Sequence, residues 1–578
     1  MPLSIDGAES EVLPRVDQTA LCGLLRRLPH NELDEVLRHR ILCAVKLPGA
    51  EFHVACGTLA LSHARARGLR IIAYAEAPDF LAAVRSAHGQ FLIDRAALGL
   101  MRHWPAYSAS RPLTAAQAAV IAALGGFAWY LAFQLPPQFA VAGFAAVGGL
   151  FFLSVVVLRM MCFLPAAPRE TWPGAAAAAA AEPVLPAYSV LVPLFRETRV
   201  LPQLTGALAS LRYPAERLDI KLIIEDNDLP MRRAVAALKL DSRFEVIVVP
   251  AGKPRTKPRA LNYALPFCRG ALLTVYDAED IPDPDQLLKA ARSFARLPPE
   301  VACLQAQLTF YNPDENWLAR QFAAEYAVLF GLLLPALDSH HLPLPLGGTS
   351  NHFRIEVLRA IGGWDPFNVT EDADLGLRLA RLGYKAAILD SFTHEEANTR
   401  PGNWLAQRSR WLKGFLLTWL VHMRAPVKLR RQLGLRGFWI MQALTLGVFV
   451  SALLYPSGLV LVLAFYGSGG MLRQNASVAL NCLLGVNLVA FIAGHASAIL
   501  LMRRGARSHG LRCSWIAVAT VPLYWCLMSA AAWLALWQFA TQPFHWNKTE
   551  HGLSRQPAAV RALPDARSSA HLRDSLRS

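Results

Sequence analysis

Charge is what this sequence has little of. Only 17% of its residues are charged and 54% are hydrophobic, a balance that excludes an ordinary soluble protein. Four stretches carry no charged residue at all: 112–158, 437–472, 474–502 and 513–547. Because a helix of roughly 20 apolar residues spans a bilayer, each stretch can cross a membrane at least once. The sequence therefore predicts an integral membrane protein that acts beside the lipid bilayer.

Paired cysteines are also lacking. The nine cysteines are scattered through the chain and none forms a CxxC pair, which argues against a structural zinc site or a disulfide framework. The net charge of +16 suits an anionic membrane surface and phosphorylated substrates. No basic module with interleaved aromatic residues is present, so we expect no nucleic-acid partner.

The first uncharged stretch begins at residue 112, too late for a cleavable signal peptide. Pro136 and Pro137 divide it, so residues 112–164 are expected to form a transmembrane hairpin. Basic residues flank the hairpin and none lies in its turn. By the positive-inside rule both of its ends are cytoplasmic, as is the large polar region at 187–430 that follows.

The C-terminal membrane region, 437–541, is expected to contain three to four spans. Its first stretch contains Pro456 and reads either as one long span or as a tight hairpin. A hairpin places the basic segment 503–512 outside, whereas a single span exports the basic tail at 542–578. Either choice conflicts with the positive-inside rule, so charge alone leaves both open.

Residues 1–105, before the first membrane segment, read as a small soluble α/β module. Residues 165–186 read as an Ala/Pro linker, and the region after it is predicted to be a larger α/β unit. Short apolar runs then alternate with helix-like segments, which indicates a mainly parallel, Rossmann-like sheet. These runs lie at 188–193, 220–225, 244–249, 271–276 and 386–390. Ligands bind beyond the carboxyl ends of such strands, so the polar residues there are the candidates for function.

The stretch LLTVYDAEDIPDPD, residues 272–285, ends an apolar run in five carboxylates. These acids repel one another unless a positive group lies among them. Asp283 and Asp285 are explained by the start of a helix, where the helix dipole favours anions. Asp277 and Glu279 come directly after the strand, while Asp280 has no assigned role. Oxygen-ligand divalent cations are held by a few carboxylates plus substrate phosphates.

A second acidic motif, VTEDADLGLRLARLGY, begins at residue 369. Thr370 is a suitable N-cap, with Asp372 and Asp374 in the first turn. A well-capped helix is enough to explain these acids. The alternative is a catalytic carboxylate, because a general base must lie within hydrogen-bond reach of the proton that it removes.

The motif QRSRW occupies residues 407–411. Gln407, Arg408 and Trp411 share one side of a helix by their spacing. Arginines make forked bonds to phosphate, and tryptophan offers an apolar plate for a sugar. An amphipathic helix at the membrane surface explains the same residues, and both interpretations can hold together.

The ordered set D-x-acid, T-E-D and Q-R-x-R-W resembles the membrane-embedded family 2 glycosyltransferases of the cellulose synthase-like group, over about 188–414. The resemblance implies a GT-A-type domain inserted between transmembrane helices in a bacterial inner membrane. It implies processive, inverting transfer from a UDP-sugar, glucose first, to a growing β-linked polysaccharide that the protein exports. A glycolipid synthase with a membrane lipid acceptor is the first alternative. A catalytically inactive receptor or secretion component is the second.

The resemblance also implies roles for single residues. Asp372 is the general base, beside Thr370 and Glu371, and Asp277 and Glu279 hold Mg²⁺ or Mn²⁺. Glutamate stands at position 279 where the family has its second aspartate. The acceptor-end motif is Gln407, Arg408, Arg410 and Trp411. Donor-side residues are Glu197, Glu225, Asp226, Asp228, Lys257, Gly348 and Thr349.

Two terminal segments carry weaker resemblances. In PFHWNKTEHGL, residues 543–553, Trp546, Lys548, Thr549 and His551 resemble a gating segment of related synthases, and a membrane-exit sequence is the alternative. Residues 1–105 resemble the N-terminal module of type II secretion ATPases, variants of which bind cyclic di-GMP. We therefore expect a regulatory module, with cyclic di-GMP or a regulatory or export protein as the candidate partner.

Overall fold

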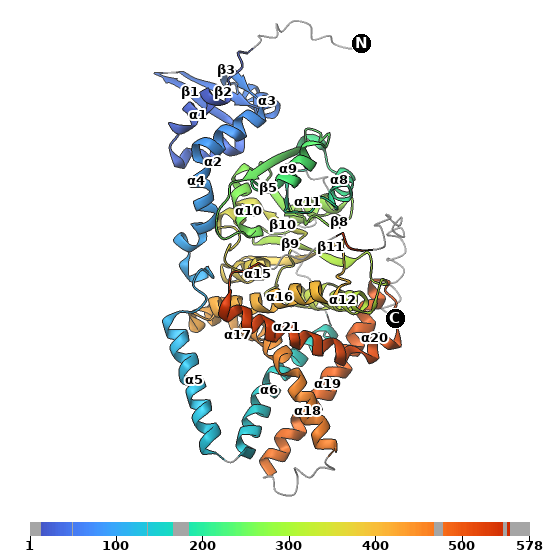
Figure 1. Ribbon diagram of the computed structural model, residues 1–578. Coiled ribbons are helices and arrows are strands. Elements are labelled where there is room, and N and C mark those ends of the chain that lie inside the picture. The colour runs from blue at the N-terminus through green and yellow to red at the C-terminus, as the bar shows by residue number, and fades with distance from the viewer. Residues whose placement is uncertain are drawn as a thin grey trace.

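The computed structural model describes residues 13–48, 50–135, 137–165, 184–467, 478–546 and 552–554. Figure 1 shows four parts stacked along one direction. A small N-terminal module lies at one end, followed by a unit built around a large sheet, then by a layer of helices that run across the molecule. Helical hairpins extend from this layer at the opposite end.

The N-terminal module is a three-stranded sheet in the order β1-β2-β3 with helices packed on it. The strand expected near residue 70 is β3. The elements of the module are α1 (Gln18–Arg26), α2 (His30–His39), β1 (Ile41–Leu47), β2 (Ala50–Cys56), α3 (Thr58–Ala66), β3 (Arg70–Ala75) and α4 (Ala77–His103).

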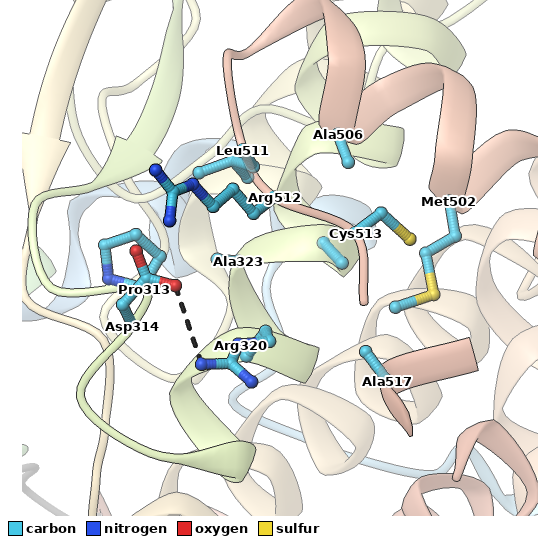
Figure 2. A pocket seen from close by; sticks show the side chains of 11 residues that line it. Pro313, Asp314, Arg320, Ala323, Met502, Ala506, Leu511, Arg512, Cys513 and Ala517 are labelled. Carbon is cyan, nitrogen blue, oxygen red and sulfur yellow. Dashed lines mark ion pairs between the residues drawn. The ribbon is translucent and has the colours of Figure 1, made fainter. Parts of the chain in front are cut away.

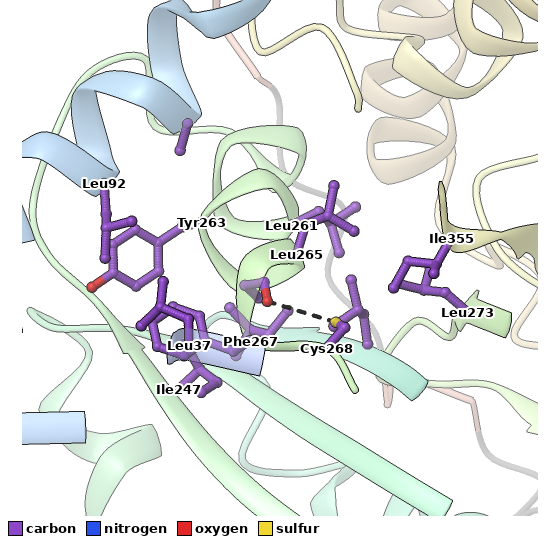
Figure 3. Close-up of a cluster of buried hydrophobic side chains, with 14 of the residues drawn as sticks. Leu37, Leu92, Ile247, Leu261, Tyr263, Leu265, Phe267, Cys268, Leu273 and Ile355 are labelled. Atoms are coloured by element: carbon purple, nitrogen blue, oxygen red, sulfur yellow. Dashed lines mark hydrogen bonds between the residues drawn. The ribbon is translucent and has the colours of Figure 1, made fainter. Parts of the chain in front are cut away.

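The module shares one apolar core with the central unit. Leu37 of α2 and Leu92 of α4 pack in the same buried cluster as Ile247, Leu261 and Phe267 (Figure 3). Buried apolar contact contributes roughly 25 cal/mol per Å², so this continuous core fixes the module rigidly on the sheet.

A buried ionic network joins the same two parts. Arg40, at the end of α2, pairs with Glu245 of the central sheet. Glu245 also accepts from Lys221 at 2.6 Å, and Lys221 contacts Asp219 at 2.7 Å. Each buried charge in this set therefore faces an opposite one, as burial requires.

The central unit contains an eight-stranded mixed sheet in the order β6-β5-β4-β7-β10-β9-β11-β8. β4, β5, β6 and β7 are parallel, as are β9 and β11, whereas β10 is antiparallel to β7 and β9. The five expected runs are β4–β7 and β11. The strands are β4 (Tyr188–Leu194), β5 (Leu218–Glu225), β6 (Phe244–Val249), β7 (Leu272–Val275), β8 (Ile281–Pro282), β9 (Val301–Phe310), β10 (Asn351–Arg354) and β11 (Lys385–Glu395).

Helices cover both faces of this sheet, which explains why strands such as β5 are buried along nearly their whole length. The covering helices are α8 (Leu201–Ala209), α9 (Leu229–Ala236), α10 (Lys257–Ala264), α11 (Gln286–Arg296), α14 (Ile355–Ala360) and α15 (Glu371–Arg381).

Beneath the sheet, a layer of helices runs across the molecule (Figure 1). Leu412 and Leu416 of α16 pack against Ala531 and Ala535 of α21 in one buried cluster. The layer contains α12 (Trp317–Val328), α13 (Leu334–Ser339), α16 (Pro401–His422), α17 (Pro426–Gln442), α20 (Trp515–Ala519) and α21 (Val521–Thr541).

Four helices extend away from the layer as two hairpins: α5 (Ala115–Gln134), α6 (Pro137–Met160), α18 (Val448–Gly467) and α19 (Val478–Ser508). Among the described residues, five helices are long and apolar enough to cross a membrane: Ala142–Phe163, Trp317–Ser339, Pro426–Val460, Asn481–Ser508 and Val521–Thr541. Ala115–Leu131 is a shorter apolar helix. The chain is thus a membrane protein. Trp317–Ser339 and Val521–Thr541 lie in the layer rather than along the hairpins.

The described residues of the C-terminal region favour one long helix over a tight hairpin between residues 437 and 467. Residues 437–467 form one continuous helical path through Pro456. The basic segment 503–512 returns to the sheet side, where Arg512 and Leu511 line a small hollow with Asp314 and Arg320 (Figure 2). Residues 552–554 also lie on that side, because their N–H groups bind Glu396.

Candidate functional site

The candidate site lies at the carboxyl end of β7, between the starts of α10 and α15. Lys257, at the start of α10, places its Nζ 2.5 Å from Asp277 Oδ1 and donates to the Gly348 carbonyl at 2.7 Å. Burial opposes the charge on Lys257, but Asp277 and Glu371 outweigh it and raise the pKa of this amine. The site is therefore organised around one buried, permanently charged ammonium.

Asp277 belongs to a cluster of acids that includes Glu279, Asp280 and Glu197. The Asp280 carboxylate accepts from the Asp277 N–H at 2.7 Å and from the Thr349 hydroxyl. Burial, together with Asp277 and Glu197, raises the pKa of Glu279 well above its usual range, and burial and Asp277 do the same for Asp280. The acids crowd one another as expected from the sequence, and Lys257 is the cation that lies among them.

Asp283 and Asp285 are separated from this cluster. Asp285 is the N-cap residue of α11 and contacts Arg212 at 3.2 Å. Asp283 pairs with Lys289 at 2.5 Å. Both acids lie at the start of α11, as the helix-start interpretation of Asp283 and Asp285 predicts.

The chemistry of the acid cluster fits a divalent cation. Asp280 Oδ1 is buried without a hydrogen-bond partner in the described part of the chain, and the neighbouring acids hold more negative charge than Lys257 can balance. All of the donors are carboxylate oxygens, which suit Mg²⁺ or Mn²⁺. Asp277 and Glu279 would hold the ion, with Asp280 positioning the Asp277 backbone.

Asp372 lies across the site from Asp277. It is in the first turn of α15, where it accepts the N–H of Ala373 at 2.7 Å. A side chain at Gly348 would reach to 3.2 Å from Asp372 Oδ2, so the glycine leaves open the space in front of this carboxylate. Burial raises the pKa of Asp372, while the Ala373 N–H, Lys257 and Arg410 counteract it. Asp372 is thus a basic carboxylate facing an open position.

Glu371 differs from its neighbour in its surroundings. Its side chain is 4% exposed, and burial together with Asp372 raises its pKa to about 8. Glu371 therefore holds a proton near neutrality more readily than Asp372 does.

The TED motif is fixed from behind by α16. Thr370 donates its backbone N–H to Asn368 at 3.1 Å, and Asn368 donates to Thr418 of α16 at 2.9 Å. Gly414 of α16 faces Thr370 so closely that a Cβ there would lie 2.3 Å from the Thr370 hydroxyl. The position of Asp372 depends on this close approach of two helices.

The two arginines of QRSRW point to different places. Arg410 reaches toward the site: Glu371, Asp372 and Asp277 all act on its charge, and its Nε is buried without a partner among the described residues. Arg408 is paired with Glu325 of α12 at 2.6 Å and with the Tyr524 hydroxyl of α21 at 3.2 Å. One arginine is available to a phosphate and the other joins the helices of the layer.

The remaining residues of this motif, Gln407 and Trp411, contact other residues of the helical layer and the sheet edge. Trp411 stacks on Tyr326 with ring centroids 6.2 Å apart, and the Arg408 guanidinium lies 4.6 Å from the Trp411 ring. The Gln407 carbonyl accepts from Asn398 at 2.9 Å. The motif is therefore part of the floor that separates the site from the hairpins.

The residues expected to recognise the donor gather at the ends of β4 and β5. Glu225 binds Arg259 through both of its oxygens, at 2.6 and 2.7 Å. Asp228 caps α9 and accepts the Arg196 N–H at 2.5 Å. Glu197 lies on the same side, close enough to raise the pKa of Glu279.

Two arginines from different elements lie close to Asp226. Arg232 contacts it at 3.1 Å, and Arg85 from α4 of the N-terminal module lies 3.6 Å away. The module therefore touches the loop where the resemblance expects nucleotide recognition.

Residues 542–546, at the start of the C-terminal segment, lie against α16. The Trp546 ring is 4.5 Å from the Arg410 guanidinium, and Lys413 donates to the carbonyls of Gln542 and His545. Lys548, Thr549 and His551 lie outside the described residues.

The sequence did not identify several residues that build this site. Gln305 of β9 accepts the Gly347 N–H at 2.7 Å and donates to the Thr349 carbonyl at 3.0 Å. Glu395, at the end of β11, has its pKa raised by burial and by Asp280 and Glu279. Glu395 ends β11, so the strand-end rule could have found it, whereas Gln305 lies in the middle of β9 and leaves no such signal.

Residues 272–542, a little under half of the chain, match the family model described as Glycosyl transferase family group 2. The match begins at the acidic strand end and includes both TED and QRSRW. Together with the mixed sheet, it confirms the expected GT-A-type fold combined with apolar helices.

The curated relatives include proteins named for a glycolipid product and proteins named for a polysaccharide product. β-Monoglucosyldiacylglycerol synthase of Synechocystis is 28% identical over 300 residues, 50% of this chain and 61% of that protein. Probable glucomannan 4-β-mannosyltransferase 1 of Arabidopsis thaliana is 27% identical over 239 residues, 40% of this chain and 43% of that protein. The chain thus spans less than two thirds of the length of either relative.

One solved structure is the mannosyltransferase PcManGT from Pyrobaculum calidifontis in complex with GDP-Man and Mn²⁺. It is 18% identical, with a TM-score of 0.40, and the alignment covers 68% of this chain and 99% of that one.

Proposed function

We propose that this family 2 glycosyltransferase transfers a sugar from a UDP-sugar, glucose first, to a growing β-linked polysaccharide and exports the polymer. The observation that supports sugar transfer is that one space is lined by Lys257, Asp277, Gly348, Asp372 and Arg410. Cations, an acid cluster and a separate basic carboxylate occupy three sides of it. A nucleotide diphosphate, its sugar and an acceptor hydroxyl need these three environments.

The donor diphosphate would lie against Lys257 and Arg410. Lys257 contacts Asp277 and the Gly348 carbonyl, while the buried Arg410 Nε offers a donor without a partner among the described residues. A divalent cation held by Asp277 and Glu279 would neutralise the charge that develops on the departing nucleotide. Charge-assisted bonds from Lys257 and Arg410 would stabilise the same developing charge.

Asp372 would take the proton from the attacking hydroxyl. The absence of a side chain at Gly348 leaves room for a sugar directly in front of Asp372 Oδ2, and a general base must lie within hydrogen-bond reach of the proton it removes. A single base with a metal-assisted leaving group implies one displacement. An α-linked donor would therefore yield a β-linkage.

The acceptor would enter from the side of α16. Trp411 and Tyr326 form an aromatic floor there, and the hairpins extend directly beneath it (Figure 1). A polymer that grows at this floor would leave the site toward the membrane, which favours a polysaccharide that is exported as it is made.

A glycolipid synthase is the second candidate. The floor lies next to the membrane part of the chain, so a lipid acceptor could also present its hydroxyl to Asp372. In the described part of the chain the elongated helices form two hairpins, with α21 across their top rather than beside them, which leaves fewer helices to enclose a polymer.

Product size separates the two candidates. The purified full-length protein is incubated with radiolabelled UDP-glucose, UDP-N-acetylglucosamine or GDP-mannose and Mn²⁺ in lipid vesicles. Labelled material that stays at the origin of a chromatogram and resists chloroform–methanol supports a polysaccharide. Label extracted with the lipids supports the glycolipid synthase, and no transfer from any donor contradicts both.

A further inference from the structure

Helix α17 is kinked at Gly434 and carries exposed cations on both sides of the kink. Lys428, Arg430, Arg431 and Arg436 are all exposed, and no residue between 426 and 442 is acidic. Within the part of the chain that the structure describes, none of the four makes an ion pair with a carboxylate of another element. Four cations held close together without counter-charge favour an anionic partner.

Exposed apolar side chains alternate with these cations. Val427, Leu435 and Trp439 are 61%, 61% and 60% exposed. A helix with cations and large apolar residues both exposed is typical of the interface of a membrane, where the apolar groups enter the acyl boundary. Tryptophan is also enriched at that level.

The neighbours of α17 place it at the membrane surface. At its start, Arg424 donates to the carbonyls of Pro105 and Arg111, just before α5 begins. At its end, α17 continues through Ala443–Gly447 into α18. The helix therefore connects the beginnings of two membrane helices and lies where phospholipid headgroups are found.

We propose that α17 is a binding site for the headgroups of anionic phospholipids. The four cations would contact phosphate groups while Val427, Leu435 and Trp439 enter the acyl region. Each cation near an anionic surface contributes about 1 kcal/mol, which is roughly a fivefold preference for anionic over zwitterionic lipid.

The buried side of α17 contacts the helix that carries Asp372. Leu429 packs with Leu377 of α15 in one cluster, and Gln432 accepts from Arg381 of α15 at 2.9 Å. Lipid bound to the outer side would hold α17 in place and so hold α15 against the site. This consequence rests on the proposed role of Asp372, whereas lipid binding itself does not.

Spin-labelled lipids test the binding directly. The full-length protein is placed in phosphatidylcholine vesicles with traces of spin-labelled phosphatidylglycerol or phosphatidylcholine, and the motionally restricted fraction of each is measured. We expect the protein to prefer phosphatidylglycerol, and the variant K428Q/R430Q/R431Q/R436Q to lose most of that preference. The matched control R26Q/R27Q/R65Q/R67Q removes four exposed charges from the N-terminal module, at the far end of the molecule (Figure 1), and should keep it.

Salt gives a second readout that needs no variant. Because exposed charge pairs are screened at high ionic strength, 0.5 M NaCl should reduce the preference of the unmodified protein. Equal preference in the α17 variant and the control, or a preference unaffected by salt, would overturn the proposal.

Hydrogen exchange tests the coupling without requiring transferase activity. Amides of residues 371–381 should exchange more slowly in phosphatidylglycerol vesicles than in phosphatidylcholine vesicles, and this difference should vanish in the α17 variant. Lipid preference without any change in α15 exchange would overturn the coupling and leave the binding site standing.

Discussion

Replacing Gly414 with alanine should displace the proposed catalytic base without touching it. The new Cβ would lie 2.3 Å from the Thr370 hydroxyl, 2.4 Å from its Cγ2 and 2.7 Å from its Cβ. These distances are too short for any real contact, and a β-branched side chain has little rotameric freedom to move away. Thr370 or the backbone of α16 must therefore shift.

The size of the effect follows from two opposed terms. Overpacking of this kind costs about 1–3 kcal/mol, offset by up to about 1 kcal/mol from the better helix propensity of alanine. Because Thr370 precedes Glu371 and Asp372, the shift is transmitted to the base. A misplacement of about 1 Å can reduce a rate about 100-fold, so we expect transfer to fall by about 10- to 100-fold with donor binding nearly unchanged.

Gly402→Ala is the matched control. It lies on the same helix, gains the same methyl group, and meets nothing within 4 Å. Initial rates of labelled sugar transfer and thermal unfolding in detergent are measured for both variants beside the unmodified protein. If the two variants transfer sugar equally well, the close contact between α16 and the TED motif does not position Asp372.

Further predictions concern charge at the site. Lys257→Met should reduce transfer by about 100- to 1,000-fold, as loss of a preorganised charge donor does, while the exposed Lys239→Met should leave the rate unchanged. A chelator should abolish transfer and added Mn²⁺ or Mg²⁺ should restore it, except in Asp277→Ala; activity that survives chelation would exclude the metal. Burial raises the pKa of Asp372 and the base must be unprotonated, so kcat should fall as the pH decreases through that raised value. Arg410→Gln removes a cation that lowers this pKa, so the acid limb should move to higher pH; an unmoved limb would assign it to another group.

The sequence predicted the strands that follow the ordinary rules. Runs such as 220–225 are short, β-branched and bounded by polar residues, and they became β5 and its neighbours. β10 escaped notice because it has only four residues, Asn351–Arg354, three of them polar. His352 is buried there between Tyr188 and Gln286, and that burial lowers its pKa to about 3. Tertiary contacts, rather than local pattern, make this strand.

The candidate site was predicted as a set of residues but not as an arrangement. Local pattern identified Asp277 and Asp372, yet only the fold shows Lys257 between them. Local pattern also could not predict that Arg408 and Arg410 point in different directions. The direction of Arg408 depends on Glu325, which lies more than 80 residues away in the chain. Close contacts such as Gly414 with Thr370 leave no sequence signal except the glycine itself.

The measurement that tests the central claim most directly compares the unmodified protein with Asp372→Asn. Both are assayed for transfer of labelled sugar from UDP-glucose with Mn²⁺, and for UDP binding by calorimetry. A general base contributes about 100- to 10,000-fold, so the variant should bind UDP as before and lose transfer by at least about 100-fold. Near-normal transfer by a folded Asp372→Asn variant that still binds UDP would contradict the account.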